Sequence, residues 1–225
     1  MSSRDRVLAR IRNALTDIPA TETPESVGVP RNYLRSHAGA DRVALFAERV
    51  ADYHATVVRT TEDRAPAVVG DLLAARRSRT VVVPEGFPAA LLPDRDGGYL
   101  RDDPPLTVRE LDAADTVLTT AALGIAVTGT LVLDAGPGQG RRALTLLPDH
   151  HVCVVHEEQI AADVPEALAR LNPTAPLTFV SGPSATSDIE LERVEGVHGP
   201  RVLDVVVVAA NPAEGTGPDL GDCGR

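Results

Sequence analysis

The sequence contains no lysine, so all 22 of the basic residues in its 225 positions are arginine. This absence excludes a Schiff-base lysine, a P-loop lysine and a catalytic Ser–Lys pair. Cysteine is almost as scarce, because Cys153 and Cys223 are the only two and neither belongs to a C-x-x-C motif. An iron–sulfur cluster requires four ligands, and a cysteine-rich zinc site requires nearly as many cysteine ligands. We therefore expect no cluster and no metal site in this chain.

A net positive charge and long apolar runs are also missing. The formal net charge is -10, whereas a nucleic-acid footprint needs clustered basic residues on one face. No apolar run approaches the roughly 20 residues of a membrane helix. The first 15 residues are charged throughout and lack the apolar core of a signal peptide. We expect a cytoplasmic protein that neither spans a membrane nor binds nucleic acid.

The two ends of the chain differ from its middle. Ser2 or Ser3 can cap a helix whose apolar residues Val7, Leu8, Ile11 and Leu15 form one stripe. Three prolines and no apolar period follow between residues 17 and 40, so residues 1–38 are predicted to be a helical extension with a linker. Such a helix, without neighbours of its own, suggests a homo-oligomer or a partner subunit. Residues 211–225 are rich in Gly, Pro and Asp and are predicted to be disordered.

Residues 39–210 alternate apolar, β-branched runs with amphipathic segments. The predicted helices lie near residues 43–53, 68–73 and 164–171. The predicted strands are 56–59, 80–83, 116–120, 130–133, 151–155, 177–180 and 202–208, with a loop at 93–105. Continuous apolar strands between helices are typical of a mostly parallel sheet that is covered on both faces. The sequence therefore predicts one α/β domain.

Two glycine-rich segments flank the strand at 130–133. Gly124, Thr128, Gly129 and Thr130 precede it, and their backbone and hydroxyl groups could either bind an anion or form a tight turn. Asp134–Arg142 follows it, with Gly138, Arg141 and Arg142 as candidate anion ligands. The alternative for this second segment is an exposed loop with solvated arginines. Its glycine spacing does not match the dinucleotide fingerprint.

Histidines and hydroxyl groups supply the remaining candidates. His150 and His151 are adjacent at the start of a strand and should point to opposite faces, which argues against a metal site that uses both. One of them could instead act as a proton donor or anion ligand. The segment Ser181–Glu190 follows another strand, where open α/β sheets place ligands. Its candidates, together with the histidine between two later glycines, are Ser181, Gly182, Ser184, Thr186, Asp188 and His198.

Taken in order, these segments resemble the LUD-domain family. The resemblance rests on Gly124-Ile125-Ala126-x-Thr128-Gly129-Thr130, Leu147-Pro148-x-x-His151, Ser181-Gly182-Pro183-Ser184-x-Thr186-x-Asp188-Ile189-Glu190 and Gly196-Val197-His198-Gly199-Pro200. It implies a three-layer Rossmann-like sandwich similar to the ribose-phosphate isomerase and CoA transferase fold. Many relatives carry an acidic residue at the position of Val127 and an arginine at that of Ala185, so this chain lacks both charges.

The resemblance also implies a role in oxidising L-lactate to pyruvate together with iron–sulfur partner proteins. The clusters would then belong to the partners, and this chain would bind a small anionic metabolite. On this hypothesis Arg141 or Arg142 holds a carboxylate, His198 or His151 takes a proton from a 2-hydroxyl, and Asp188 orients the histidine.

Two alternatives remain at this point. One is a stand-alone enzyme or binding protein for a phosphorylated or CoA-linked metabolite, which rests on fold analogy. The other is a scaffolding protein whose N-terminal helix and linker hold a second subunit.

Overall fold

A computed structural model describes residues 2–19, 21–23, 28, 30, 39, 41–186, 194–196 and 198–209. The chain separates into two compact units, Met1–Leu34 and Arg35–Arg225. The predicted division near residue 38 is not tested further by the structure. The predicted disordered tail, residues 211–225, lies outside the described residues.

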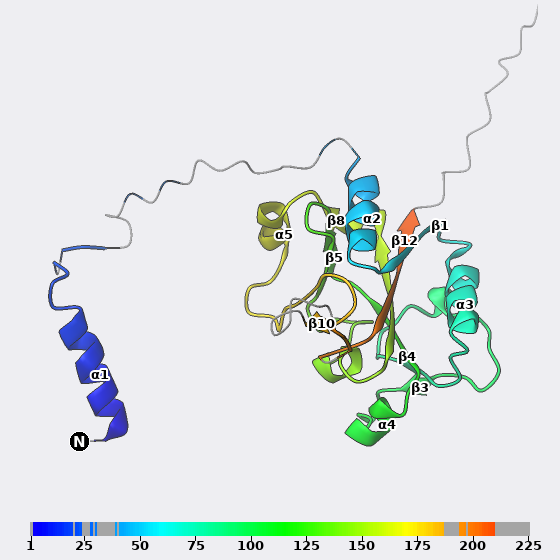
Figure 1. Cartoon of the computed structure of the whole chain (residues 1–225), viewed down its shortest axis with the longest axis horizontal. Helices are drawn as coiled ribbons and strands as arrows, with labels where there is room; N and C mark the ends of the chain where they lie inside the picture. Colours follow the sequence, from blue (N-terminus) through cyan, green and yellow to red (C-terminus); the bar gives the residue numbers. More distant parts are fainter. Residues whose placement is uncertain are drawn as a thin grey trace, which may run out of the picture. The chain divides into compact units, whose positions relative to one another are not determined.

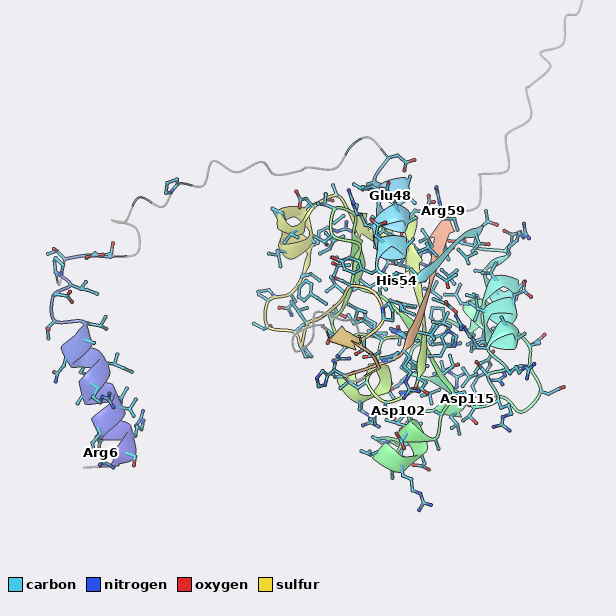
Figure 2. All side chains as sticks on the ribbon, in the orientation of Figure 1. Arg6, Glu48, His54, Arg59, Asp102 and Asp115 are labelled. Carbon is cyan, nitrogen blue, oxygen red and sulfur yellow. The ribbon has the colours of Figure 1, made fainter. Side chains whose placement is uncertain are left out.

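The first unit contains the helix α1 (Ser3–Ala14), shown in blue in Figure 1. Ser2 caps it as the sequence predicts, because its hydroxyl accepts from the Asp5 N–H at 3.2 Å and the Asp5 carboxylate accepts from the Ser2 N–H at 2.9 Å. Side chains stand out on every side of this helix in Figure 2, and none of its residues is buried. The apolar residues Val7 and Ile11 are therefore exposed within the described residues of this unit.

In the described part of the second unit, three α-helices agree with the predicted ones, and a further short α-helix, Val108–Asp112, was not predicted. The α-helices are α2 (Arg42–Asp52), α3 (Ala65–Ala75), α4 (Val108–Asp112) and α5 (Val164–Arg170). Three 3-10 turns accompany them, η1 (Ala89–Leu91), η2 (Arg142–Thr145) and η3 (Glu157–Gln159). Side-chain oxygens cap α2, α4 and α5 at Asp41, Thr107 and Asp163, which explains where these helices begin.

A six-stranded sheet forms the centre of this unit, in the order β1-β12-β7-β4-β2-β3. Every neighbouring pair in it is parallel. Its strands are β1 (Thr56–Thr61), β2 (Val81–Val83), β3 (Leu100–Arg101), β4 (Thr116–Thr120), β7 (His150–His156) and β12 (Val202–Ala209). The mixed α/β class and the mostly parallel sheet flanked by helices confirm the predicted fold class. The short strand β3 lies inside the predicted loop 93–105, which was wrong at this point.

Alternate residues of the central strands enter two different cores. Val206 and Val208 of β12 pack with Val69 and Leu73 of α3 on one face. On the other face Val205 and Val207 pack in the core that includes Phe46 of α2 and residues of a second sheet. This alternation follows from the two-residue period of a strand, and it explains why these strands are apolar without interruption.

The second sheet was not predicted. It has four strands in the order β8-β5-β6-β9, namely β8 (Ile160–Ala161), β5 (Leu123–Ile125), β6 (Thr130–Leu133) and β9 (Thr178–Val180). β5 and β8 escape a search for apolar runs because they are two or three residues long, and β5 contains Gly124. A Cβ at Gly124 would lie 2.9 Å from the Phe46 ring, so glycine lets β5 approach α2 closely. The predicted turn between the strands at 116–120 and 130–133 is thus a strand followed by a turn.

Candidate functional site

A cavity of about 250 Å³ lies beside the amino ends of β7 and β12. It is bounded by the two ends of η2, by His151, by residues 179–184 at the end of β9 and after it, and by residues 198–200 before β12. The sequence predicted a ligand site at the carboxyl end of a parallel strand. The structure differs because β9, which positions the Ser181–Ser184 loop, belongs to the second sheet and pairs antiparallel to β6.

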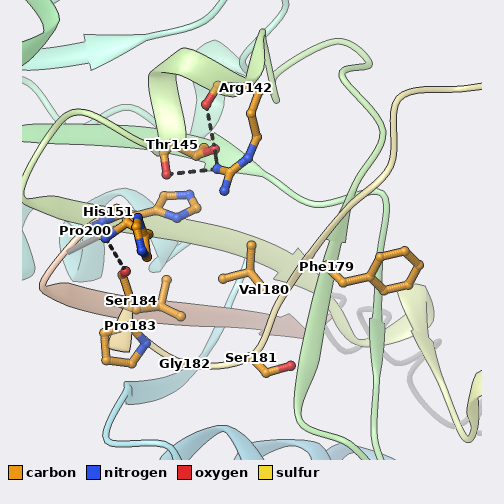
Figure 3. Close-up of a pocket in the computed structure, with 13 residues that line it drawn as sticks. Arg142, Thr145, His151, Phe179, Val180, Ser181, Gly182, Pro183, Ser184 and Pro200 are labelled. Carbon is orange, nitrogen blue, oxygen red and sulfur yellow. Dashed lines mark hydrogen bonds between the residues drawn. The ribbon is translucent and has the colours of Figure 1, made fainter. Parts of the chain in front are cut away.

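Arg142 supplies positive charge at one wall of this cavity. Its Nη1 donates to the Thr145 carbonyl at 3.2 Å and to the Thr145 hydroxyl at 2.8 Å. Partial burial lowers the pKa of this guanidinium, which nevertheless stays charged. Its Nε and Nη2 have no partner among the residues that the structure describes. Figure 3 shows the side chain turned back toward Thr145, with Phe179 pointing away from both.

His151 lines the cavity and is only 1% exposed. Burial, with smaller contributions from the charges of His150 and Arg142, lowers its pKa to about 3, so the imidazole is neutral. Its Nε2 lies 2.7 Å from the Thr119 hydroxyl, which donates to Cys153 Sγ at 3.6 Å. In the tautomer that carries its proton on Nε2, Thr119 accepts from Nε2–H and Nδ1 carries a lone pair. Nδ1 has no partner among the described residues.

Two loops close the opposite wall around Ser184. The Ser184 N–H donates to the Pro200 carbonyl at 2.9 Å, and the Ser184 carbonyl accepts from the Gly196 N–H at 2.9 Å. The Ser184 hydroxyl accepts from the His198 N–H at 3.1 Å. These bonds hold the exposed His198 at the cavity rim.

Burial raises the pKa of Cys153 to about 12, so its thiol behind Thr119 stays protonated.

A short chain of hydroxyl groups connects the first glycine-rich segment to this cavity. Thr130 Oγ1 lies 2.7 Å from Thr128 Oγ1 and 2.8 Å from Ser181 Oγ. Gly129 makes the turn, with φ of 57°, and a Cβ there would collide with the backbone of Arg49. The first glycine-rich segment thus positions Ser181, while the segment's own residues lie outside the cavity lining.

The second glycine-rich segment packs against the carboxyl ends of β2 and β4. The Gly138 N–H donates to the Glu85 carbonyl at 2.8 Å, so this amide is already satisfied within the chain. A Cβ at Gly138 would lie 2.8 Å from Thr120 Oγ1, which accounts for glycine at this position. The part of this segment before Arg141 serves close packing here and does not line the 250 Å³ cavity.

Arg141 is held elsewhere, by Asp102. Its Nε donates to Asp102 Oδ2 at 2.8 Å, and its Nη2 donates to Asp102 Oδ1 at 2.9 Å and to the Leu106 carbonyl at 2.6 Å. Burial raises the pKa of Asp102, but the bonds from Arg141 and the Leu106 N–H outweigh it, so the pKa lies below its ordinary value. Arg141 lines a different cavity, at the ends of β2 and β3.

His150 points to the opposite face from His151, as the sequence predicted. Its Nε2 lies 2.9 Å from Asp204 Oδ2, and its Nδ1 lies 3.0 Å from the Thr116 hydroxyl. All three residues are buried. Both ring nitrogens are therefore occupied, and His150 contributes to the interior rather than to the cavity.

The structure brings together fewer than half of the predicted site residues. Those that line the cavity are His151, Arg142, Ser181, Gly182, Ser184 and His198. Those outside it are Gly124, Thr128, Gly129, Thr130, Gly138 and Arg141. Thr186 pairs through its backbone with Val194, and Asp188 lies outside the described residues. Sequence reasoning missed Thr145 and Thr119, and a threonine one turn after Arg142 was the available signal for the first.

Comparison with known proteins places these residues in a wider context. The LUD domain family model matches residues 101–208. Lactate utilization protein C of Deinococcus radiodurans is 48% identical over 173 residues, which cover 75% of this chain and 80% of that protein. The protein of the same name from Halalkalibacterium halodurans is 26% identical over 190 residues, or 78% and 82% of the two chains. A solved DUF162 family protein from Deinococcus radiodurans superposes with a TM-score of 0.64 at 39% identity, covering 78% of this chain and 99% of the other.

Among the described residues, no three His, Cys, Asp or Glu side chains gather as they would around a metal ion. Within the same part of the chain, no helix has the length and apolar character to cross a membrane.

Proposed function

The chain belongs to the LUD-domain family, and from this membership we propose that it acts in lactate utilisation by binding a small hydroxy acid between Arg142 and His151. The similarity to Lactate utilization protein C over 80% of that protein's length supports the pathway. The observation that carries the site is the pairing of a cation with a neutral imidazole in one cavity. His198 shares this cavity with Arg142 as well, but it is exposed at the rim, whereas His151 is buried.

Each group has a distinct role in this proposal. The unoccupied edge of the Arg142 guanidinium binds the carboxylate, while Thr145 fixes the opposite edge. The lone pair on His151 Nδ1 accepts a hydrogen bond from the 2-hydroxyl. When the acid is oxidised to the 2-oxo acid, the hydroxyl proton passes to Nδ1, while the Cα proton and the two electrons pass to an acceptor on a partner protein. Thr119 holds the ring through Nε2, and the proposal requires the tautomer with its proton on that nitrogen. Ser181, Ser184 and His198 complete the polar wall.

The electrons of such an oxidation must leave through another protein. The chain has only two cysteines, and one of them, Cys153, is buried and hydrogen-bonded to Thr119. We therefore assign the iron–sulfur clusters to partner proteins, with this chain as the substrate-binding component. A tagged chain from lactate-grown cells should co-purify iron and lactate-dependent dye reduction. A preparation with neither would contradict the partner assignment.

The site is tested by Arg142→Gln, with Arg109→Gln on α4 as the matched control. Arg109 is also an exposed arginine, but it lies outside the cavity lining. Loss of one charge-assisted bond to a carboxylate should weaken L-lactate binding about 10- to 100-fold. The measurement is the Kd for L-lactate by calorimetry on the full chain, with growth on L-lactate as the cellular readout. Equal Kd values in both variants would remove Arg142 from the site.

A further inference from the structure

A second cavity adjoins the first across the side chain of Arg142. It has a volume of about 350 Å³, and Arg142 and Thr145 line both cavities. The second cavity is otherwise bounded by the end of β6, by the Ala135–Gly140 loop and by the segment that enters β9. Arg142 therefore stands between two spaces rather than at the end of one.

The two cavities differ in chemistry. The first presents serine hydroxyls and two histidines. The second presents Leu133, Ala135, Pro176 and Leu177, with no ionisable side chain except Arg142. Its one amide, Gln139, is engaged, because Oε1 accepts from the Asp134 N–H at 2.6 Å. The second cavity is thus suited to an aliphatic group and the first to polar groups.

We propose that the two cavities form a single site for 2-hydroxy carboxylates with an aliphatic tail longer than the methyl group of lactate. The carboxylate lies on Arg142, the 2-hydroxyl faces His151, and the tail extends past Arg142 between Leu133 and Pro176. The inference rests on the proposed function, because both use the same anion site. It adds the substrate class and the part of the fold that selects it.

Size and anchoring support one extended site. Pockets for small molecules measure about 300 to 1,000 Å³, and the first cavity alone, at about 250 Å³, falls below that range. Together the two cavities lie within it. Thr145 holds Nη1 of Arg142, so the guanidinium is fixed at the junction, where the Cα of a bound acid would direct its hydroxyl into the polar cavity and its tail into the apolar one.

The test is a chain-length series on the full protein. Calorimetry with L-lactate, 2-hydroxybutyrate and 2-hydroxyhexanoate should give Kd values that fall about fourfold for each added methylene. Pro176→Glu places a carboxylate at the rim of the apolar cavity and should abolish this gain. Pro173→Glu is the matched control, since it adds the same charge at an exposed proline of the same segment that does not line the cavity.

The outcomes separate this inference from the proposed function. Equal Kd values across the series in the wild-type chain would overturn the extended site and leave lactate binding intact. A chain-length gain that persists in Pro176→Glu would also overturn it, because the tail would then lie elsewhere. Failure of every acid to bind would overturn both proposals. A gain that is lost in Pro176→Glu and kept in Pro173→Glu would support the extended site.

Discussion

Two pairs of identical neighbours divide their tasks in the same way. Arg141 is tied to Asp102, whereas Arg142 faces the cavity. His150 is tied to Asp204, whereas His151 faces the cavity. In each pair the first residue pairs with a carboxylate of the chain and the second lines the cavity. Residue type alone therefore does not identify the cavity-lining residues, because a shift of one position along the backbone separates the two environments.

The cause is local geometry in both pairs. His150 and His151 are successive residues of β7, so their side chains leave the sheet on opposite faces. Arg141 has an extended backbone, with φ of -76° and ψ of 154°, and precedes η2, whereas Arg142 begins that turn. The change of conformation between them sends one guanidinium to Asp102 and the other to the cavity.

The largest expected effect comes from removing Asp204, the buried carboxylate partner of His150. Asp204→Ala leaves His150 Nε2 buried without its partner and should lower the free energy of unfolding by about 3 kcal/mol. Asp204→Asn can still accept that hydrogen bond and should cost clearly less. Urea unfolding at pH 7 measures both values, and the L-lactate Kd of the folded variants should stay within about twofold of wild type. A weakened Kd without loss of stability would place His150 in the site.

The next largest effect is the contribution of His151 to the pH dependence of stability. Its pKa is about 3 in the folded chain and roughly 6.5 in an unfolded chain, so the unfolded state takes up a proton first as the pH falls. Stability is therefore complete above pH 6.5 and is lost toward pH 3, at about 1.4 kcal/mol per pH unit. Between pH 6.5 and pH 5 this contribution amounts to about 2 kcal/mol.

His151→Gln should remove that part of the pH dependence. Urea unfolding at several pH values gives the slope, and His54→Asn, which replaces an exposed histidine, is the matched control. A slope that is unchanged in His151→Gln would mean that His151 is not held neutral by burial.

The sequence predicted the central sheet because its information is local and repeated. The run Val202–Val208 is long, β-branched and apolar, and such a run becomes a strand buried on both faces. The opposite directions of His150 and His151 followed from the same period. β5 and β8 gave no such signal, since each is short and the two pair with each other although they lie far apart in the sequence.

The candidate site was harder to predict because it depends on partners far along the chain. Nothing near Arg141 indicates that Asp102, 39 positions earlier, will hold it. Gly138 was a reasonable anion ligand by composition, but its amide is used by Glu85. A glycine that permits close packing and a glycine that binds an anion have the same local sequence, and only the packed chain distinguishes them.

The smallest expected effect compares the two arginines directly. Arg141→Gln leaves the Asp102 carboxylate, whose side chain is 9% exposed, without its ion pair and should lower the free energy of unfolding by about 1 kcal/mol. Arg142→Gln removes the contacts with Thr145 and should change the free energy of unfolding by less than about 0.5 kcal/mol. Paired unfolding curves resolve this difference, while L-lactate binding should change in the opposite order. If Arg142→Gln were the more destabilising of the two, its guanidinium would be a structural tie like that of Arg141, and the cavity would have lost its anchor for an anion.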